Sequence, residues 1–239
     1  MKSTLILTAT LATALLSACG DNKTTTETTT STSTETAATG DSARMDGMAG
    51  MSGAEPAGAA AGSLTGSMAK MMQQMHASKP IGNTDHDFAH MMMAHHQGAV
   101  AMSDILLRDG KDATMRQMAE KIKTDQQKEI AALDKVAERL DGAAKNYSPK
   151  DPADKFQMKV DQSMKPMMMP MAPSGDVDRD YATMMVAHHT SAVQMAEAEV
   201  AMGKDAATRK MAQLMVAAQT KEIQQFNNWL AKNGGKMKM

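Results

Sequence analysis

The sequence is poor in cysteine, in aromatic residues and in net charge. Its single cysteine excludes an internal disulfide bond. The formal net charge of −1 gives no electrostatic basis for binding nucleic acid. Because the chain has only three Phe, two Tyr and one Trp among 239 residues, other apolar side chains must fill its core. The 28 methionines are the abundant alternative, so we expect thioethers to build part of that core.

Long hydrophobic runs are also scarce, and the one near the start is short. A mostly apolar stretch over residues 5–16 follows Lys2 and leads into Leu16-Ser17-Ala18-Cys19. This pattern predicts a lipoprotein signal peptide over residues 1–18, with Cys19 as the lipidation site. The stretch is too short for a permanent membrane span, whereas several acyl chains at ~0.8 kcal/mol per CH₂ anchor a protein firmly. An ordinary secretory signal with a chance cysteine is the alternative.

The residue after Cys19 indicates where the anchor lies. It is Gly20 and not aspartate, which favours the periplasmic face of the outer membrane. We therefore expect a protein of the cell envelope that contacts the membrane only through its lipid.

A polar segment over residues 19–66 separates this anchor from the rest of the chain. It is rich first in Thr and Ser and then in Gly and Met, and it lacks a pattern that could bury a core, which predicts a disordered tether. Met45, Met48 and Met51 lie within it and are candidate metal ligands. Residues 67–82 are expected to form a short helix or a linker, whose methionines could also pack on the folded domain. We expect a chain truncated to begin at Asn83 to keep its fold.

The chain from Asp87 to Leu133 is repeated from Asp180 to Phe226 at a constant offset of 93 residues. The two copies share 21 identities in 47 positions without a gap. Both copies break at the same place, at Gly110-Lys111-Asp112 and at Gly203-Lys204-Asp205, where glycine suits a helix end and aspartate a helix start. Each copy is therefore predicted to be a helical hairpin.

Two hairpins with one apolar face each bury those faces by packing together. We expect an all-α fold in which a duplicated four-helix bundle occupies residues 83–232, followed by a flexible tail over 233–239. The four helices are predicted over residues 85–109, 112–141, 178–202 and 205–232.

The first helix of each hairpin carries soft and borderline metal ligands on one face. Methionine stands four residues before and seven residues after a histidine, a spacing that returns to the same side of a helix. A small residue, Gly98 or Ser191, lies between them. The candidate ligands are Met91, His95 and Met102 in the first copy, and Met184, His188 and Met195 in the second. Thioether and imidazole together suit copper.

Further residues are predicted either to orient the histidines of this face or to act as additional metal ligands. Asp87, Asp180, Glu129 and Glu222 recur in both copies and are predicted to hydrogen-bond to the imidazoles. Prolines deny the Met-rich connection between the hairpins a regular helix, so its thioethers are additional candidate ligands. They are Met164, Met167, Met168, Met169 and Met171. Because an imidazole must be neutral to bind metal, we expect protons to compete with copper near pH ~6.5 at the histidines but not at the thioethers.

The paired motifs Asp-[Phe/Tyr]-Ala-x-Met-Met-x-Ala-His-His-x-x-Ala-Val-x-Met, each followed by Gln-x-x-Glu-Ile, resemble the domain of unknown function 305 family. The resemblance covers about residues 83–232 and implies a ferritin-like four-helix bundle. Some members of that family are exported copper-binding proteins that support copper tolerance. By position, the resemblance adds His96 and His189 to the metal ligands. Thr183 stands where the first copy has His90, so His90 is not a duplicated ligand.

These observations predict a lipid-anchored protein that binds Cu⁺, Cu²⁺ or both, and not an enzyme. A ferritin-like di-iron site needs Glu-x-x-His motifs, and the sequence has none. A structural bundle without metal remains an alternative, either as a homo-oligomer or as a partner of another envelope protein. Metal uptake distinguishes the two.

Overall fold

The computed structural model describes residues 62–233, and over that range all the regular secondary structure is helical. The predicted signal peptide, Cys19, the tether methionines Met45, Met48 and Met51, and the tail from residue 234 lie outside the described residues. The described elements are α1 (Leu64–Ala77), α2 (Thr84–Asp109), α3 (Ala113–Leu140), α4 (Lys155–Met164), the short 3-10 helix η1 (Lys165–Met168), α5 (Val177–Met202) and α6 (Ala206–Asn233). None of the helices between residues 62 and 233 is long and apolar enough to cross a membrane.

The ends of the hairpin helices follow from the residues at the breaks. Asp112 accepts a hydrogen bond from the backbone N–H of Met115 and so caps the start of α3. Asp205 does the same for Thr208 in α6. Gly142 adopts a φ of 74° just after α3, where a side chain would strain the backbone. The four long helices therefore lie where the sequence predicts them.

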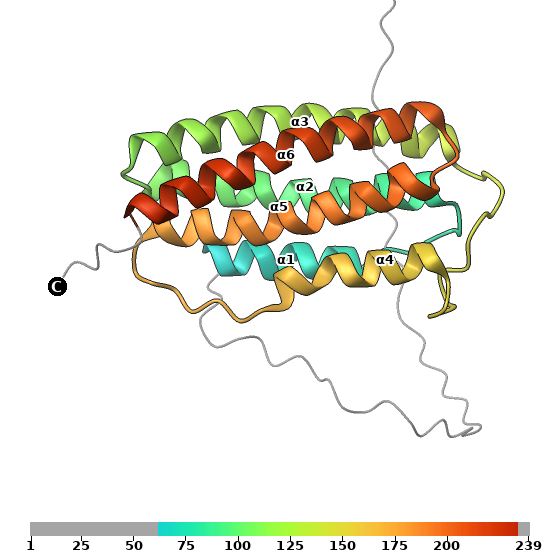
Figure 1. The fold of residues 1–239 in the computed structure, drawn as a ribbon, viewed down its shortest axis with the longest axis horizontal. Coiled ribbons are helices and arrows are strands. Elements are labelled where there is room, and N and C mark those ends of the chain that lie inside the picture. Colours follow the sequence, from blue (N-terminus) through green and yellow to red (C-terminus); the bar gives the residue numbers. More distant parts are fainter. Residues whose placement is uncertain (1–61, 234–239) are drawn as a thin grey trace, which may run out of the picture. The chain divides into compact units, whose positions relative to one another are not determined.

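Helices α2 and α5 form the centre of the molecule. They pack against each other, while α3 covers α2 and α6 covers α5 on one side. Two further helices cover the opposite side, α1 against α2 and α4 against α5 (Figure 1). Because α2 and α5 have neighbours on several sides, they bury polar as well as apolar residues. This arrangement places their histidines in the core.

Helix α1 belongs to the core and is not a linker. It buries four apolar side chains, those of Leu64, Met68, Met71 and Met75. A Cβ atom added to Gly98 of α2 would lie only 2.5 Å from the Met71 sulfur, so the glycine makes room for this thioether. Of the two expectations for residues 67–82, the structure thus supports a short helix whose methionines pack on the folded domain.

The two halves hold each other through matching aspartates. Asp85 at the start of α2 accepts hydrogen bonds from the backbone N–H groups of Lys204 and Asp205, between α5 and α6. Asp178, its equivalent 93 residues later, accepts hydrogen bonds from Lys111 and Asp112, between α2 and α3. Equivalent residues make reciprocal contacts, as at an interface with two-fold symmetry. The duplication therefore folds as a pseudo-two-fold pair.

Candidate metal centre

Four histidines meet where α2 and α5 cross the pseudo-two-fold axis. His95 and His96 come from α2, His188 and His189 come from α5, and each has 0% of its surface exposed. The rings of His95 and His188 are closest, with 3.8 Å between their centroids. They are equivalent positions of the two copies, so the packing of α2 against α5 brings the duplicated residues face to face.

The one hydrogen bond of the His188 side chain shows which of its ring nitrogens is free. Its Nε2 donates to the backbone carbonyl oxygen of His95 over 2.9 Å. In a neutral imidazole the other nitrogen, Nδ1, then carries a lone pair. That Nδ1 and both ring nitrogens of His95 are buried without a hydrogen-bond partner. Buried polar atoms are rarely left unpaired, so these nitrogens are candidate ligands.

The outer pair of histidines is tied to carboxylates. His189 Nε2 is hydrogen-bonded to Glu222 Oε2 over 3.0 Å, whereas His96 Nε2 lies 2.8 Å from Glu129 Oε2 without hydrogen-bond geometry. Nδ1 of each of these histidines is again buried and unpaired. A carboxylate on one ring nitrogen orients an imidazole and makes the other nitrogen a better ligand. The structure thus places Glu129 and Glu222 beside imidazoles, as the supporting role assigned to them requires.

Burial decides the charge of the inner histidines. Loss of solvent, reinforced by the neighbouring imidazoles, lowers the pKa of His95 well below its usual value. Loss of solvent and the nearby His189 likewise lower the pKa of His188. Both rings are therefore neutral at neutral pH, the form that binds metal. Proton competition moves below the pH of ~6.5 expected for an unperturbed imidazole.

The thioethers of the duplicated face are nearly all in the core. Met102, Met184 and Met195 are at most 3% exposed, whereas Met91 is half-buried. Met71 of α1 adds a sulfur that the repeat does not predict, because it packs against Gly98 one turn beyond His95. Its signal in the sequence is the run of methionines in residues 67–82, which suits packing as well as metal contact.

Two glutamines on the same axis also lack partners. Gln126 of α3 and Gln219 of α6 are each 3% exposed, and no amide atom of either side chain has a hydrogen bond. They line a cavity of about 230 Å³ between α3 and α6, together with Glu129 and Glu222. The cavity therefore leads to the carboxylates that contact the outer histidines. The recurring Gln-x-x-Glu motif was the signal for these glutamines.

Comparisons with known proteins identify the family of this chain. A family model described as "Domain of unknown function (DUF305)" matches residues 85–230. The chain belongs to the DUF305 family. A solved DUF305 structure from Streptomyces coelicolor, described as a candidate secreted protein, has a TM-score of 0.50 and 26% identity, covering 67% of this chain and 99% of that one. A DUF305 fragment from Deinococcus radiodurans has a TM-score of 0.47 and 20% identity, covering 64% and 99%. No curated protein matches the chain.

Asp87 and Asp180 lie away from the four core histidines, although Asp87 contacts another imidazole of the DUF305 domain, that of His86. Asp87 accepts hydrogen bonds from the backbone N–H groups of Ile81 and Gly82, and Asp180 accepts one from Ser174. Both aspartates therefore fix the chain that enters a central helix. They do not contact His95 or His188, about two helical turns further on.

The Met-rich connection is more ordered than its prolines suggest. Residues 165–168 form the helix η1, and Met167 is buried there in the hydrophobic core. Met168 and Met169 are exposed by 64% and 68%, while Met164 and Met171 are half-buried. Only part of this run is thus free to meet a metal, and Met167 is explained by packing.

Proposed function

We propose that this DUF305 protein is an exported, lipid-anchored protein that binds copper in the cell envelope. One observation carries the proposal: buried, neutral imidazoles with unpaired nitrogens lie on the helix faces that also carry buried thioethers. Unpaired ring nitrogens are costly in a core unless they serve a purpose. A metal ion with affinity for both nitrogen and sulfur would satisfy them.

The donor set favours copper over zinc. Imidazole binds Cu²⁺, thioethers select Cu⁺, and zinc seldom takes thioether ligands. His95 and His188 would supply the nitrogens, and Met102 and Met195 of the same helices would supply sulfur. His96 and His189 would complete the set from their own sides. The proposal is for binding and not for catalysis.

The cavity between α3 and α6 would let a cation approach. It opens to solvent and is lined by Asp125, Glu129 and Glu222. Glu222 is held at its edge by Lys121, 2.9 Å away. Burial alone would raise the pKa of Glu222, but His189 and Lys121 outweigh that effect and lower it, so the carboxylate stays charged. A charged carboxylate beside an imidazole attracts a metal ion toward the core.

Export is supported from two directions. The first residues of the sequence have the pattern of a lipoprotein signal, and the Streptomyces DUF305 protein is described as a candidate secreted protein. An envelope location would place the protein where incoming copper is first met.

Metal analysis after gel filtration tests the proposal. The full chain is exposed to Cu⁺, Cu²⁺ or Zn²⁺, and the bound metal is counted per chain. We expect retained copper that falls in the double variant His95→Gln/His188→Gln, because that variant removes both inner imidazoles. The control His76→Gln changes an exposed histidine of α1 and should bind as the parent does.

Absence of stoichiometric copper from the parent would overturn the proposal. It would leave the alternative of a structural bundle that contacts itself or another envelope protein. Retention of Cu²⁺ by the folded double variant, at the parent's affinity, would show that the duplicated histidines are structural. Helical circular dichroism confirms that each variant is folded.

A further inference from the structure

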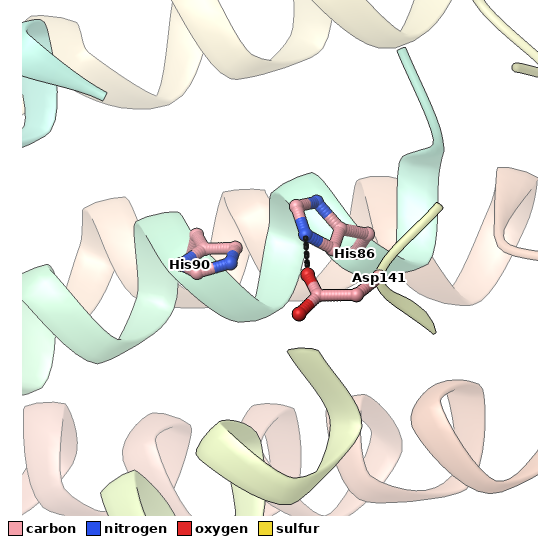
Figure 2. Close-up of side chains that lie close together, drawn as sticks. All are labelled: His86, His90 and Asp141. Atoms are coloured by element: carbon pink, nitrogen blue, oxygen red, sulfur yellow. Dashed lines mark hydrogen bonds and ion pairs between the residues drawn. The ribbon is translucent and has the colours of Figure 1, made fainter. Parts of the chain in front are cut away.

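A second group of histidines lies near the N-terminal end of α2 and belongs to the first half of the molecule alone. His86 and His90 are one turn apart on α2, and Asp141 follows α3 as its C-terminal cap (Figure 2). In the second half, Arg179 and Thr183 stand at the positions equivalent to the two histidines. The duplication therefore does not explain this group.

The three side chains point toward one another. His86 Nε2 lies 3.2 Å from Asp141 Oδ1, and the rings of His86 and His90 are 4.5 Å apart at their centroids. One ligand atom from each of the three residues lies within 4.8 Å of the other two. Among the described residues, this is the one such set of three imidazole, thiolate or carboxylate ligands. His86 is buried, whereas His90 and Asp141 are exposed to an incoming ion.

The imidazole of His86 lies between two carboxylates, and this arrangement favours a bound cation. Its Nδ1 lies 2.8 Å from Asp87 Oδ1, and because Asp87 is the closer and the buried carboxylate, we place the hydrogen of a neutral ring on Nδ1. In a neutral ring, Nε2 then presents a lone pair directly to the carboxylate of Asp141. Two acceptors at 3.2 Å repel each other unless a positive charge lies between them. That charge is either a second proton on His86 or a metal ion.

We propose that His86, His90 and Asp141 form a binding site for a divalent transition-metal cation such as Zn²⁺, separate from the core histidines. Two imidazoles and one carboxylate are ligands that zinc favours, with metal–ligand bonds of about 2.0–2.2 Å. Ligands of a tetrahedral ion with such bonds lie about 3.3–3.5 Å apart. The distance of 3.2 Å between His86 Nε2 and Asp141 Oδ1 is already close to that ligand–ligand distance. His90 is exposed and can complete the site by a small side-chain rotation.

The surroundings hold the buried ligand in place. Asp87, which orients His86, also accepts hydrogen bonds from the backbone N–H of Gly82 and from the hydroxyl of Tyr147. The backbone N–H groups of Asn146 and Tyr147 donate to the Gly82 carbonyl oxygen. The connection after α3 is thereby fastened to the start of α2. This rigid support is the arrangement that metal-ligating histidines commonly have on their second nitrogen.

Zinc titration of the full chain by calorimetry tests the site. We expect one Zn²⁺ per chain, and at least a tenfold loss of affinity in His90→Gln and in Asp141→Asn. Both positions are exposed, so the variants should fold like the parent. His76→Gln removes another exposed histidine and serves as the matched control, with affinity unchanged. Co²⁺ gives an independent signature, because visible absorption of a four-coordinate ion should be lost in the same two variants.

The copper measurements separate this site from the core. His90→Gln and Asp141→Asn should keep the parent's copper content, and His95→Gln/His188→Gln should keep the parent's zinc affinity. Absence of Zn²⁺ binding by the parent, or zinc affinity unchanged in both ligand variants, would overturn the proposal and assign the His86–Asp141 contact to a protonated ion pair. Loss of zinc in the core double variant alone would overturn it too, by placing the ion at the core histidines.

Discussion

His188 donates its Nε2 hydrogen to the backbone carbonyl oxygen of His95, and the two residues are separated by the same 93 positions as the duplication. The equivalent bond in the reverse direction, from His95 Nε2 to the carbonyl oxygen of His188, is not made. His95 is left with both ring nitrogens unpaired, whereas His188 has one. The pseudo-two-fold axis is therefore broken at its centre. Histidines that are identical in the repeat differ in their bonding.

This asymmetry predicts different stabilities for matched variants without metal. His95→Ala and His188→Ala remove the same atoms from equally buried sites, but only the second also removes the inter-helix hydrogen bond. We expect His188→Ala to be less stable than His95→Ala by about 1 kcal/mol. For a domain of this size that is a difference of about 2–4 °C in Tm by thermal unfolding. Equal melting temperatures of the two variants would mean that the hydrogen bond from His188 to His95 makes no net contribution to stability.

The exposed methionines predict a copper component that does not depend on histidine. Met168 and Met169 offer soft thioethers to solvent, and a thioether has no proton to lose. We expect Met168→Leu/Met169→Leu to reduce Cu⁺ binding while leaving Cu²⁺ binding and Tm unchanged, since the swap roughly preserves volume. Met158→Leu changes another exposed methionine, on α4, and should have no effect. A competition assay with a coloured Cu⁺ chelator measures the difference.

Helix α1 predicts a loss of stability that the sequence alone does not. Met71 is 1% exposed and its sulfur lies against Gly98, so Met71→Ala leaves a cavity. We expect it to lower the free energy of unfolding by roughly 2–5 kcal/mol, measured in urea. Lys70→Ala, at an exposed neighbouring position, should change it little. A chain that begins at Asn83 should likewise melt at a lower temperature, and unchanged melting would show that α1 docks without stabilising.

Glu199 predicts an unusual fall in stability toward alkaline pH. It stands where the first copy has Leu106, and burial and the neighbouring Asp85 raise its pKa to about 9 from an ordinary 4.5. Between these values the folded protein holds a proton that the unfolded chain lacks, so stability is lost as pH rises through this window. Glu199→Gln should remove the slope and raise Tm at pH ~8, by at least the ~2–4 °C that 1 kcal/mol represents.

A control variant and a suitable pH range separate the effect of Glu199 from that of other titrating groups. Glu197→Gln changes an exposed carboxylate on the same helix and should keep the parent's pH dependence. Measurements between pH ~7 and ~9 avoid His95 and His188, whose lowered pKa values cost stability only below about 6.5. A parent whose Tm is flat over this interval would contradict the raised pKa of Glu199.

The helices and much of the candidate centre could be predicted from the sequence because the duplication supplies a second copy of each signal. Aspartate and glycine at both breaks located the helix ends, and the recurrence of His95 as His188 indicated a shared face. Glu129 and Glu222 were placed near imidazoles by the same reasoning. Asp87 and Asp180 do not reach the core histidines, because recurrence identifies a repeated role but not which role. Both accept hydrogen bonds from the loop that precedes a central helix, and Asp87 also contacts His86.

By itself, the sequence determined the all-helical class, the hairpin boundaries and the set of histidines, since each depends on chemistry within a few residues or on the repeat. Only the tertiary structure decided where α1 packs, which nitrogen of His188 is free, and that Asp141 approaches His86 across 55 residues of chain. Those outcomes depend on the way the helices pack around the pseudo-two-fold axis. Contacts between distant segments are set by shape and burial, and no local spacing in the sequence encodes them.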